Sequence, residues 1–261
     1  VTGVQTCALP ISAVIYNSLL AATDHEGLGY PRSRRIIIPN GFDLSLYKPD
    51  VQARCAIRAE LGVSDSALLI GRVARDAPIK DTPTLVAAVA RMQHSDARLV
   101  LVGRGMSADN QGLVDLLRAA GVAHRTHLLG ERSDIQRINA ALDVAVSSSS
   151  HGEGFPNVIC EAMACETPIV ATDVAESRQI VGDDSRIVPP RDSSALAAAL
   201  DSVLRLSPAE RGQLGARDRE RVATYYSLSD VARKYAELWE RAAASSLVVG
   251  GAAPAADVEC P

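Results

Sequence analysis

The chain has 261 residues, of which 47% are hydrophobic and 22% are charged, and its formal net charge is −4 at pH 7. This composition is typical of a folded globular protein, so a disordered, collagen-like or coiled-coil chain is excluded, and no concentrated basic surface supports nucleic-acid binding. The five cysteines form no C-x-x-C pair, which disfavours a disulfide framework or a structural zinc site and favours a reducing compartment.

The first 23 residues carry no charge. A signal peptide or a membrane span is disfavoured because no basic segment precedes the apolar run, and because Pro10, Ser12 and Asn17 interrupt it. Residues 1–11 read VTGVQTCALPI, which looks like a translated sequencing-adapter tail. We interpret them as a non-native scar that takes no part in the fold.

The first predicted elements are a short strand over 13–16, a helix over 18–27 and a second strand over 35–38. The turn signal Pro39-Asn40-Gly41 closes this segment. A polar stretch follows to about residue 65, with a short helix predicted over 51–61, and we place a domain boundary near 41–50.

A regular alternation of apolar runs and helical segments comes next. Strands are predicted over 67–73, 97–103, 126–129, 142–147 and 168–172, and helices over 82–93, 111–120, 135–141, 157–165 and 177–181. The runs are nearly continuous, as in strands that are buried on both faces. The pattern predicts an α/β fold with a doubly wound parallel sheet, whose ligands bind outside the carboxyl ends of the strands.

The C-terminal part is predicted to be helical over 193–206, 208–224 and 229–243. The last helix has one apolar stripe, made by Val231, Tyr235, Leu238 and Trp239. Residues 245–261 are rich in Ala, Gly and Pro and are predicted to be disordered.

The segment from Glu153 to Met163 follows a predicted strand and opens a helix. Pro156 suits the first helical turn, Gly154 lets the backbone approach a ligand, and the first-turn amides form an anion site. Glu153 lies before the helix and Glu161 one turn inside it, so two carboxylates flank that site. A sugar nucleotide has a matching order of ribose diol, diphosphate and sugar. The alternative is that Glu161 is a solvated helix residue and Glu153 a loop charge.

A second element is Gly71-Arg72 at the end of the first long strand, with Lys80 eight residues later. Arginine offers a bidentate fork to phosphate and lysine a point charge. Together with the helix amides, they can stabilise a departing diphosphate in place of a metal ion. The alternative is that these cations form salt bridges to Asp76 or Asp81.

Two segments, IGRVARDAPIKD at 70–81 and HGEGFPNVICEAMACETPIVATDV at 151–174, resemble the nucleotide-sugar-binding half of glycosyltransferase family 4. These are retaining enzymes of the GT-B fold, and Glu153-x7-Glu161 matches their E-x7-E signature. The resemblance implies a remnant of the acceptor domain over 12–40 and an interdomain linker over 41–64. It further implies a Rossmann-like nucleotide-sugar-binding domain over 65–226, a C-terminal crossover helix over 227–244 and a tail over 245–261.

The resemblance also implies residue roles. Glu153 would contact the donor sugar, Arg72 and Lys80 the diphosphate, and these three form the expected catalytic set. Glu161 would bind the ribose, and the base would lie against the loop 129–134. The remaining expected donor-binding residues are Gly71, Gly154, Phe155, Pro156, Asn157, Leu129 and Gly130.

The implied activity of the full-length protein is transfer of a hexose from a UDP- or GDP-sugar to a hydroxyl of a glycan or lipid-linked sugar, without a metal ion. This places it in polysaccharide biosynthesis, in the cytoplasm or at the inner membrane surface. Most of an acceptor domain is missing before residue 13, so we expect the fragment alone to be inactive. A non-catalytic nucleotide-sugar-binding module and a GT-B-fold sugar-nucleotide epimerase remain as alternatives.

Three positions depart from the family pattern. Glu166 stands where the family usually has glycine after the helix, Ala175 where glycine is common and Gln179 where glutamate is common. A left-handed backbone at a non-glycine helix stop costs on the order of 1 kcal/mol.

Overall fold

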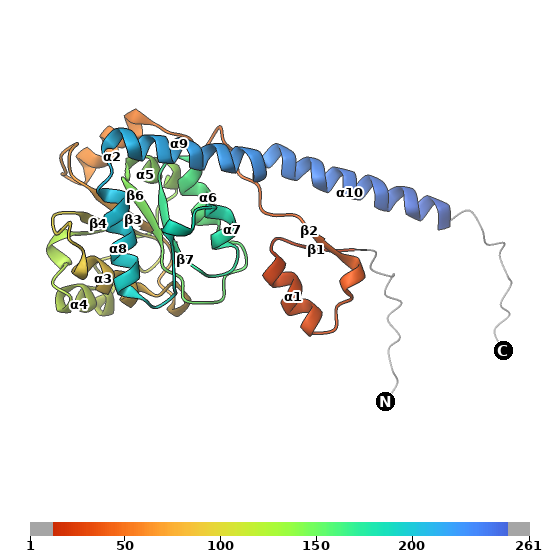
Figure 1. The fold of residues 1–261 in the computed structure, drawn as a ribbon, viewed down its shortest axis with the longest axis horizontal. Helices are drawn as coiled ribbons and strands as arrows, with labels where there is room; N and C mark the ends of the chain where they lie inside the picture. Colours follow the sequence, from red (N-terminus) through yellow and green to blue (C-terminus); the bar gives the residue numbers. More distant parts are fainter. Residues whose placement is uncertain (1–12, 250–261) are drawn as a thin grey trace.

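The structure is a computed structural model that describes residues 13–249, with side chains to residue 244. Its centre is a six-stranded sheet in the order β5-β4-β3-β6-β7-β8, and every pair is parallel (Figure 1). The strands are β3 (Leu69–Val73), β4 (Arg98–Val102), β5 (Thr126–Leu128), β6 (Val144–Ser147), β7 (Ile169–Thr172) and β8 (Ile187–Val188). The predicted doubly wound α/β fold is confirmed.

Strand β4 illustrates why the apolar runs are continuous. Its residues 99–102 have no exposed surface, yet their side chains alternate between two separate hydrophobic clusters. Leu99 and Leu101 belong to the cluster on one face of the sheet, and Val100 and Val102 to the cluster on the other. Both faces must therefore be apolar, as in a parallel sheet that is covered on both sides.

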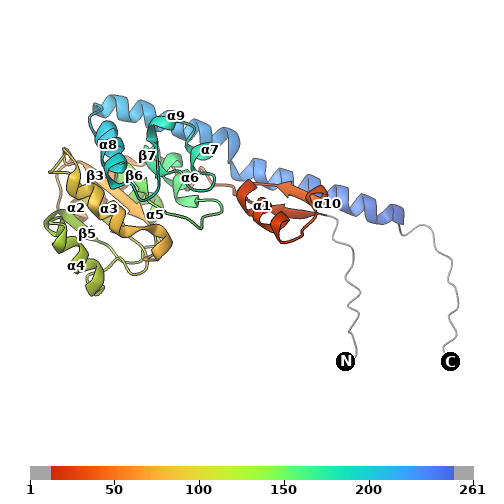
Figure 2. The same cartoon turned by 60° about the horizontal axis from the view of Figure 1, so that its bottom comes forward.

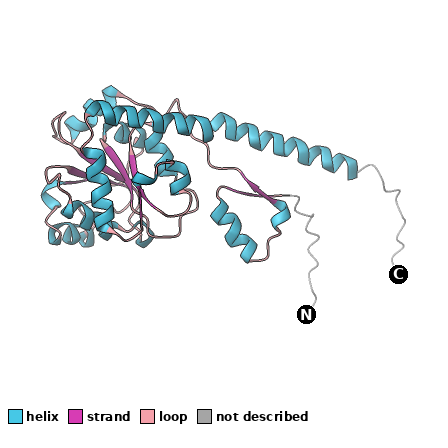
Figure 3. Ribbon diagram, viewed as in Figure 1, coloured by secondary structure: helices cyan, strands magenta, loops and turns pink. Residues whose placement is uncertain are grey.

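Helices cover both faces (Figures 1 and 3). The first cluster includes residues of α3 (Thr82–Arg91), α4 (Gln111–Ala119) and α8 (Ser193–Leu204). The second includes residues of α2 (Val51–Glu60), α5 (Ile135–Ala141), α6 (Asn157–Ala164), α7 (Ser177–Val181) and α9 (Pro208–Tyr225). Strand β8 was not predicted, because a two-residue edge strand leaves almost no pattern in the sequence.

The N-terminal segment forms a small unit beside the sheet (Figures 1 and 2). Strands β1 (Val14–Tyr16) and β2 (Arg35–Ile37) pair in parallel, and α1 (Leu19–Gly27) connects them, capped by the Ser18 hydroxyl. The amides of Leu19 and Leu20 donate hydrogen bonds to Glu176 Oε1, at 2.7 and 3.4 Å. A carboxylate from the main sheet domain thus satisfies the first turn of α1.

The last two helices differ from prediction in length. Helix α9 begins with a capping box made by Ser207 and Glu210, and α10 (Leu228–Val249) extends beyond the sheet, on the side of the N-terminal unit (Figures 1 and 2). The predicted disordered tail is wrong for 245–249, which continue α10; residues 250–261 and the interpreted scar lie outside the described residues. Val231 is buried, whereas Trp239 is 65% exposed. Within the described residues, no helix is long and apolar enough to cross a membrane.

Candidate functional site

The candidate site lies where the strand order reverses, between β3 and β6. At such a switch point the connections leave the sheet in opposite directions, which opens a crevice at the carboxyl ends of the strands. Arg72 comes from β3, and a run of serines ends β6. They line one small cavity, together with Val73, Ala74, Lys80, Val146 and Val158.

Arg72 is almost fully buried, with 2% of its surface exposed. Its guanidinium donates to the carbonyl of Lys80 at 3.0 Å and to Thr82 Oγ1 at 2.7 Å. Burial lowers its pKa to about 10, and Asp76 and Asp81 partly oppose that effect, so the group stays charged at pH 7. Its Nε is buried and has no hydrogen-bond partner within the described residues. A buried donor without a partner is costly, but the Nε of Arg58 in α2 shares this condition, so it does not by itself indicate a ligand.

Lys80 ends a short 3-10 turn after β3, and its ammonium forms an ion pair with Glu153. The Ser149 hydroxyl donates to the same carboxylate oxygen, Oε1, at 2.6 Å. Three predicted site residues are therefore brought together, since Arg72 binds the carbonyl of Lys80.

The alternative in which Asp76 or Asp81 pairs with these cations is wrong for Lys80. Asp76 accepts a hydrogen bond from Asn110 at 2.8 Å. Asp81 has a left-handed backbone and caps α3 through the amide and hydroxyl of Thr84. Both aspartates serve local turns, which leaves Lys80 for Glu153.

The serine run organises the site, a role that the sequence analysis missed. Ser148 donates to the carbonyl of Lys80 at 2.9 Å, and the amide of Ser150 donates to the carbonyl of Ile79 at 2.8 Å. These bonds tie the loop after β6 to the loop after β3. Four consecutive serines at a strand end were the available signal, because hydroxyls at that edge can hold neighbouring loops together.

After Glu153, the segment that leads into α6 supplies backbone rather than side chains. Pro156 takes the N-cap position, and the helix begins at the next residue, Asn157. The sequence had predicted Pro156 within the first helical turn. Proline has no N–H, so Pro156, one of the expected donor-binding residues, cannot contribute an amide to the anion site. The amides of Asn157 and Val158 lie at the helix start, where an α-helix offers them no internal partner.

Other predicted donor-binding residues have packing roles. The Phe155 ring is 8% exposed and packs between Phe42 and Tyr226, with ring centroids 6.2 and 5.6 Å away. A Cβ on Gly71 would lie 2.1 Å from a methyl group of Leu142, so close packing accounts for this glycine. At Gly154 a Cβ would make only ordinary contacts, which gives no steric reason for glycine there. Direct contact of these three with a donor stays a prediction.

Glu161 lies on the same face of α6 as Val158, three residues earlier, which lines the cavity. Among the described residues, no hydrogen bond or ion pair joins it to Arg72, Lys80 or Glu153, whose partners are other groups. Burial raises its pKa. Burial, and then the Glu161 charge, raise the pKa of Tyr47 to about 12. Glu161 is thus a half-buried carboxylate that does not line the cavity, and its binding of a ribose stays a prediction.

The loop after β5 is fixed by its backbone. Gly130 has a φ of +62°, and its amide donates to the carbonyl of Met106 at 2.8 Å. The Arg72 guanidinium in turn contacts the Met106 sulfur at 3.6 Å, so this loop is linked to the cluster. Leu129 is half-buried against the second hydrophobic cluster. Contact of Leu129 and Gly130 with a base stays a prediction.

The departures from the family pattern have measurable backbone consequences. Glu166 adopts the left-handed φ of 58° that its place at a helix stop predicted, and Ala175 has a φ of 52°, which was not predicted. Gln179 is exposed and its carbonyl accepts from Arg221 at 2.6 Å. None of these three residues takes part in the hydrogen bonds or the ion pair of the cluster.

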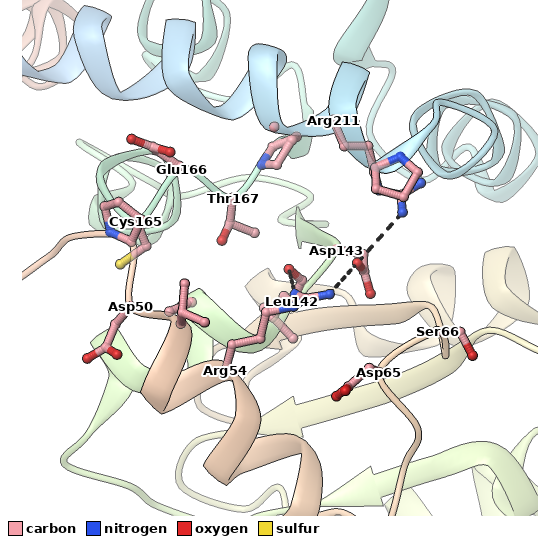
Figure 4. A pocket seen from close by; sticks show the side chains of 16 residues that line it. Asp50, Arg54, Asp65, Ser66, Leu142, Asp143, Cys165, Glu166, Thr167 and Arg211 are labelled. Carbon is pink, nitrogen blue, oxygen red and sulfur yellow. Dashed lines mark hydrogen bonds and ion pairs between the residues drawn. The ribbon is translucent and has the colours of Figure 1, made fainter.

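A larger cavity lies at the opposite, amino edge of the sheet (Figure 4). Asp143 stands at its wall, with Arg54 at 2.9 Å and Arg211 at 3.8 Å. None of the predicted site residues lines it. In the part of the chain that the structure describes, no group of three or more His, Cys, Asp or Glu residues could hold a metal ion.

Comparison with known proteins shows which family the chain resembles. The family model of glycosyl transferases group 1 matches residues 64–205. A D-inositol 3-phosphate glycosyltransferase of Geodermatophilus obscurus is 36% identical, over 87% of this chain and 52% of that protein. A phosphatidyl-myo-inositol mannosyltransferase of Mycolicibacterium smegmatis is 31% identical, over 82% and 53%. The chain spans about half the length of these curated relatives.

Solved structures agree with the fold. Anabaena Alr3699/HepE in complex with UDP and glucose superposes with a TM-score of 0.80 at 26% identity, over 88% of this chain and 63% of that one. Sucrose-phosphate synthase from Thermosynechococcus elongatus gives 0.79 at 28% identity, over 89% and 59%. The family match covers more than half of the chain and includes β3, the serine run and the E-x7-E segment. The chain therefore belongs to the glycosyl transferases of group 1, as its resemblance to family 4 predicted.

Proposed function

We propose that this chain is the donor-binding half of a retaining glycosyltransferase, which transfers a hexose from a UDP- or GDP-sugar to a hydroxyl. The observation that carries the proposal is the cluster of Arg72, Lys80 and Glu153 at the switch point of the sheet. Two cations and a carboxylate beside a helix N-terminus match the charges of a diphosphate and the hydroxyls of a sugar.

In the proposed reaction, the bond between the anomeric carbon and the diphosphate oxygen breaks. The acceptor oxygen bonds to that carbon on the same face, and its proton passes to the departing diphosphate. Arg72, Lys80 and the first amides of α6 stabilise the charge that develops on the leaving group. Because these groups supply positive charge, the proposal requires no metal ion.

The relatives support the choice of substrates. The Anabaena protein binds UDP-glucose in a further complex, at 25% identity to this chain, which favours a UDP-sugar as donor. The names of the curated relatives favour an acceptor with a cyclitol or lipid-linked hydroxyl. We propose action in the cytoplasm, at the inner membrane surface when the acceptor is lipid-linked.

Titration calorimetry with UDP, UDP-glucose, GDP and GDP-mannose tests the proposal. We expect one nucleotide pair to bind, and Lys80→Ala to weaken that binding by about 10- to 100-fold, because a hydrogen bond to a charged group contributes about 1.5–3 kcal/mol. Lys234→Ala, on the exposed part of α10, is the matched control and should change nothing. Absence of binding to all four nucleotides, or equal affinity of the Lys80 variant, contradicts the proposal.

A second measurement separates transfer from its alternatives. The full-length protein should transfer sugar to an acceptor with retained anomeric configuration, whereas this chain alone should bind without turnover. Binding without transfer by the full-length protein would favour a non-catalytic module, and a changed sugar in the recovered nucleotide would favour an epimerase.

A further inference from the structure

The Lys80–Glu153 pair has a consequence for which ligand the site prefers. Both side chains are largely buried, at 17% and 12% exposure. They come from loops 73 residues apart. In the ligand-free protein, the charge that should hold the diphosphate is therefore already compensated by the carboxylate that should hold the sugar.

The two oxygens of Glu153 are not equivalent. Oε1 accepts from both Lys80 and Ser149, while Oε2 accepts no hydrogen bond from any described residue. One oxygen is thus committed to the pair, and the other has free capacity for a hydroxyl donor.

Ligands with and without a sugar meet this arrangement differently. A free nucleoside diphosphate must compete with Glu153 for Lys80, and it places its own negative charge beside that carboxylate. A nucleotide sugar brings hydroxyl groups that donate to Glu153, which compensates the carboxylate and leaves Lys80 to the diphosphate. Like charges oppose the first ligand, and complementary groups favour the second.

We infer that Glu153 is a specificity-determining residue that makes the site prefer an intact nucleotide sugar over the free nucleoside diphosphate. Glu153 holds Lys80 until the hydroxyl groups of the sugar replace Lys80 as the partner of the carboxylate. The inference rests on the proposed function and extends it to release of product. After the sugar has been transferred, Glu153 pairs again with Lys80 and weakens the hold on the diphosphate.

The test compares the wild-type chain with Glu153→Gln, which keeps the shape and the Ser149 hydrogen bond but removes the charge. Calorimetry with UDP and UDP-glucose, and with GDP and GDP-mannose, gives the affinity ratio of sugar nucleotide to free diphosphate. We expect the variant to bind the free diphosphate about tenfold more tightly, and the nucleotide sugar no more tightly than wild type, so that the ratio falls. Glu220→Gln, an exposed position on α9, is the control.

A ligand-free measurement tests the pair itself. The chain has three lysines, so mass spectrometry after acetylation reports on Lys80 with Lys234 as the internal standard. We expect the Lys80 rate, relative to Lys234, to rise severalfold in Glu153→Gln if the carboxylate holds the ammonium. An unchanged relative rate overturns the inference even if the variant binds no ligand.

The outcomes separate the two proposals. If neither protein binds any of the four nucleotides, the proposed function fails and the inference fails with it. If both bind but the ratio is the same in wild type and Glu153→Gln, the inference alone is overturned.

Discussion

The two edges of the sheet hold buried charges that are arranged in opposite ways. At the amino edge, Asp143 accepts hydrogen bonds from Arg54, Arg58 and the amide of Leu69, at 2.8–3.3 Å. At the carboxyl edge, the buried Arg72 guanidinium donates only to neutral groups among the described residues, chiefly the carbonyl of Lys80 and Thr82 Oγ1. The larger cavity lies at the amino edge, where the Asp143 carboxylate compensates the arginines, although Arg58 Nε has no hydrogen-bond partner in the described residues. A buried guanidinium without a carboxylate partner, rather than cavity size, therefore marks the edge that we propose binds a diphosphate.

Removal of the amino-edge carboxylate gives the largest expected effect. Asp143→Ala should lower the free energy of unfolding by about 3–5 kcal/mol, because it leaves buried arginine charge uncompensated. Chemical denaturation measures this. Asp115→Ala removes an exposed ion pair with Arg118 and should cost less than about 0.5 kcal/mol. If the two variants are equally stable, the buried charges at the amino edge do not stabilise the fold.

Arg72→Lys sharpens the comparison at the other edge. Lysine keeps one charge but cannot donate to Lys80 and Thr82 together while facing a phosphate. We expect nucleotide affinity to fall by about tenfold or more. A parallel thermal melt should show a smaller loss of stability than for Asp143→Ala. An affinity equal to wild type would show that Arg72 stabilises the fold, as the arginines at the amino edge do, and does not bind the nucleotide.

Glu161→Gln tests whether this half-buried carboxylate destabilises the fold. Burial raises the pKa of Glu161 above its ordinary value of 4.5, so ionisation of this group disfavours the folded state. The stability that protonated Glu161 contributes is fully present below the unfolded-state pKa. It is lost as the pH rises through the pKa of Glu161 in the folded protein. The variant should thus have a higher Tm than wild type at pH 7 and an equal Tm below about pH 4.

The same variant should bind the nucleotide more weakly, since an amide accepts less strongly than a carboxylate from two ribose hydroxyls. A gain of Tm that persists at low pH would point to packing rather than charge. Titration calorimetry at pH 7 supplies the second half of the test.

The smallest effect is expected at Glu166, which lines the cavity at the amino edge. A left-handed backbone costs a non-glycine residue about 1–2 kcal/mol. Glycine relieves this strain, but it also raises the entropy of the unfolded chain, which offsets part of the gain in stability. Glu166→Gly should therefore stabilise the fold by about 0.5 kcal/mol, with unchanged nucleotide affinity. Denaturant midpoints measured side by side with wild type resolve this change. A loss of stability would show that the Glu166 side chain makes a contribution larger than its backbone strain.

The sequence predicted well what depends on local pattern. The α5 bounds were predicted to the residue, and those of α6 to within one residue, because apolar spacing and flanking turns determine them. The left-handed Glu166 followed from one substituted glycine. Strand β8 was missed, since two residues carry no period.

The site was predictable in its members but not in its pairings. Lys80 had nearby aspartates as candidate partners, and the choice of Glu153 depends on how two loops 73 residues apart are held by the serine run. Burial of the Phe155 ring likewise depends on distant residues in the linker and after α9. Such long-range contacts leave no spacing signal in a single sequence.

The aromatic rings around Phe155 give the fold a mechanical link. Phe42 exchanges backbone hydrogen bonds with Tyr226 and Leu228, at 2.9 and 3.0 Å, and both aromatic rings contact Phe155. Phe155 is two residues from Glu153, and Leu228 begins α10. A swing of the long C-terminal helix must therefore repack the ring next to the E-x7-E loop. A partner that moves α10 would therefore also change the shape of the loop that carries Glu153, which we propose sets the preference between substrate and product.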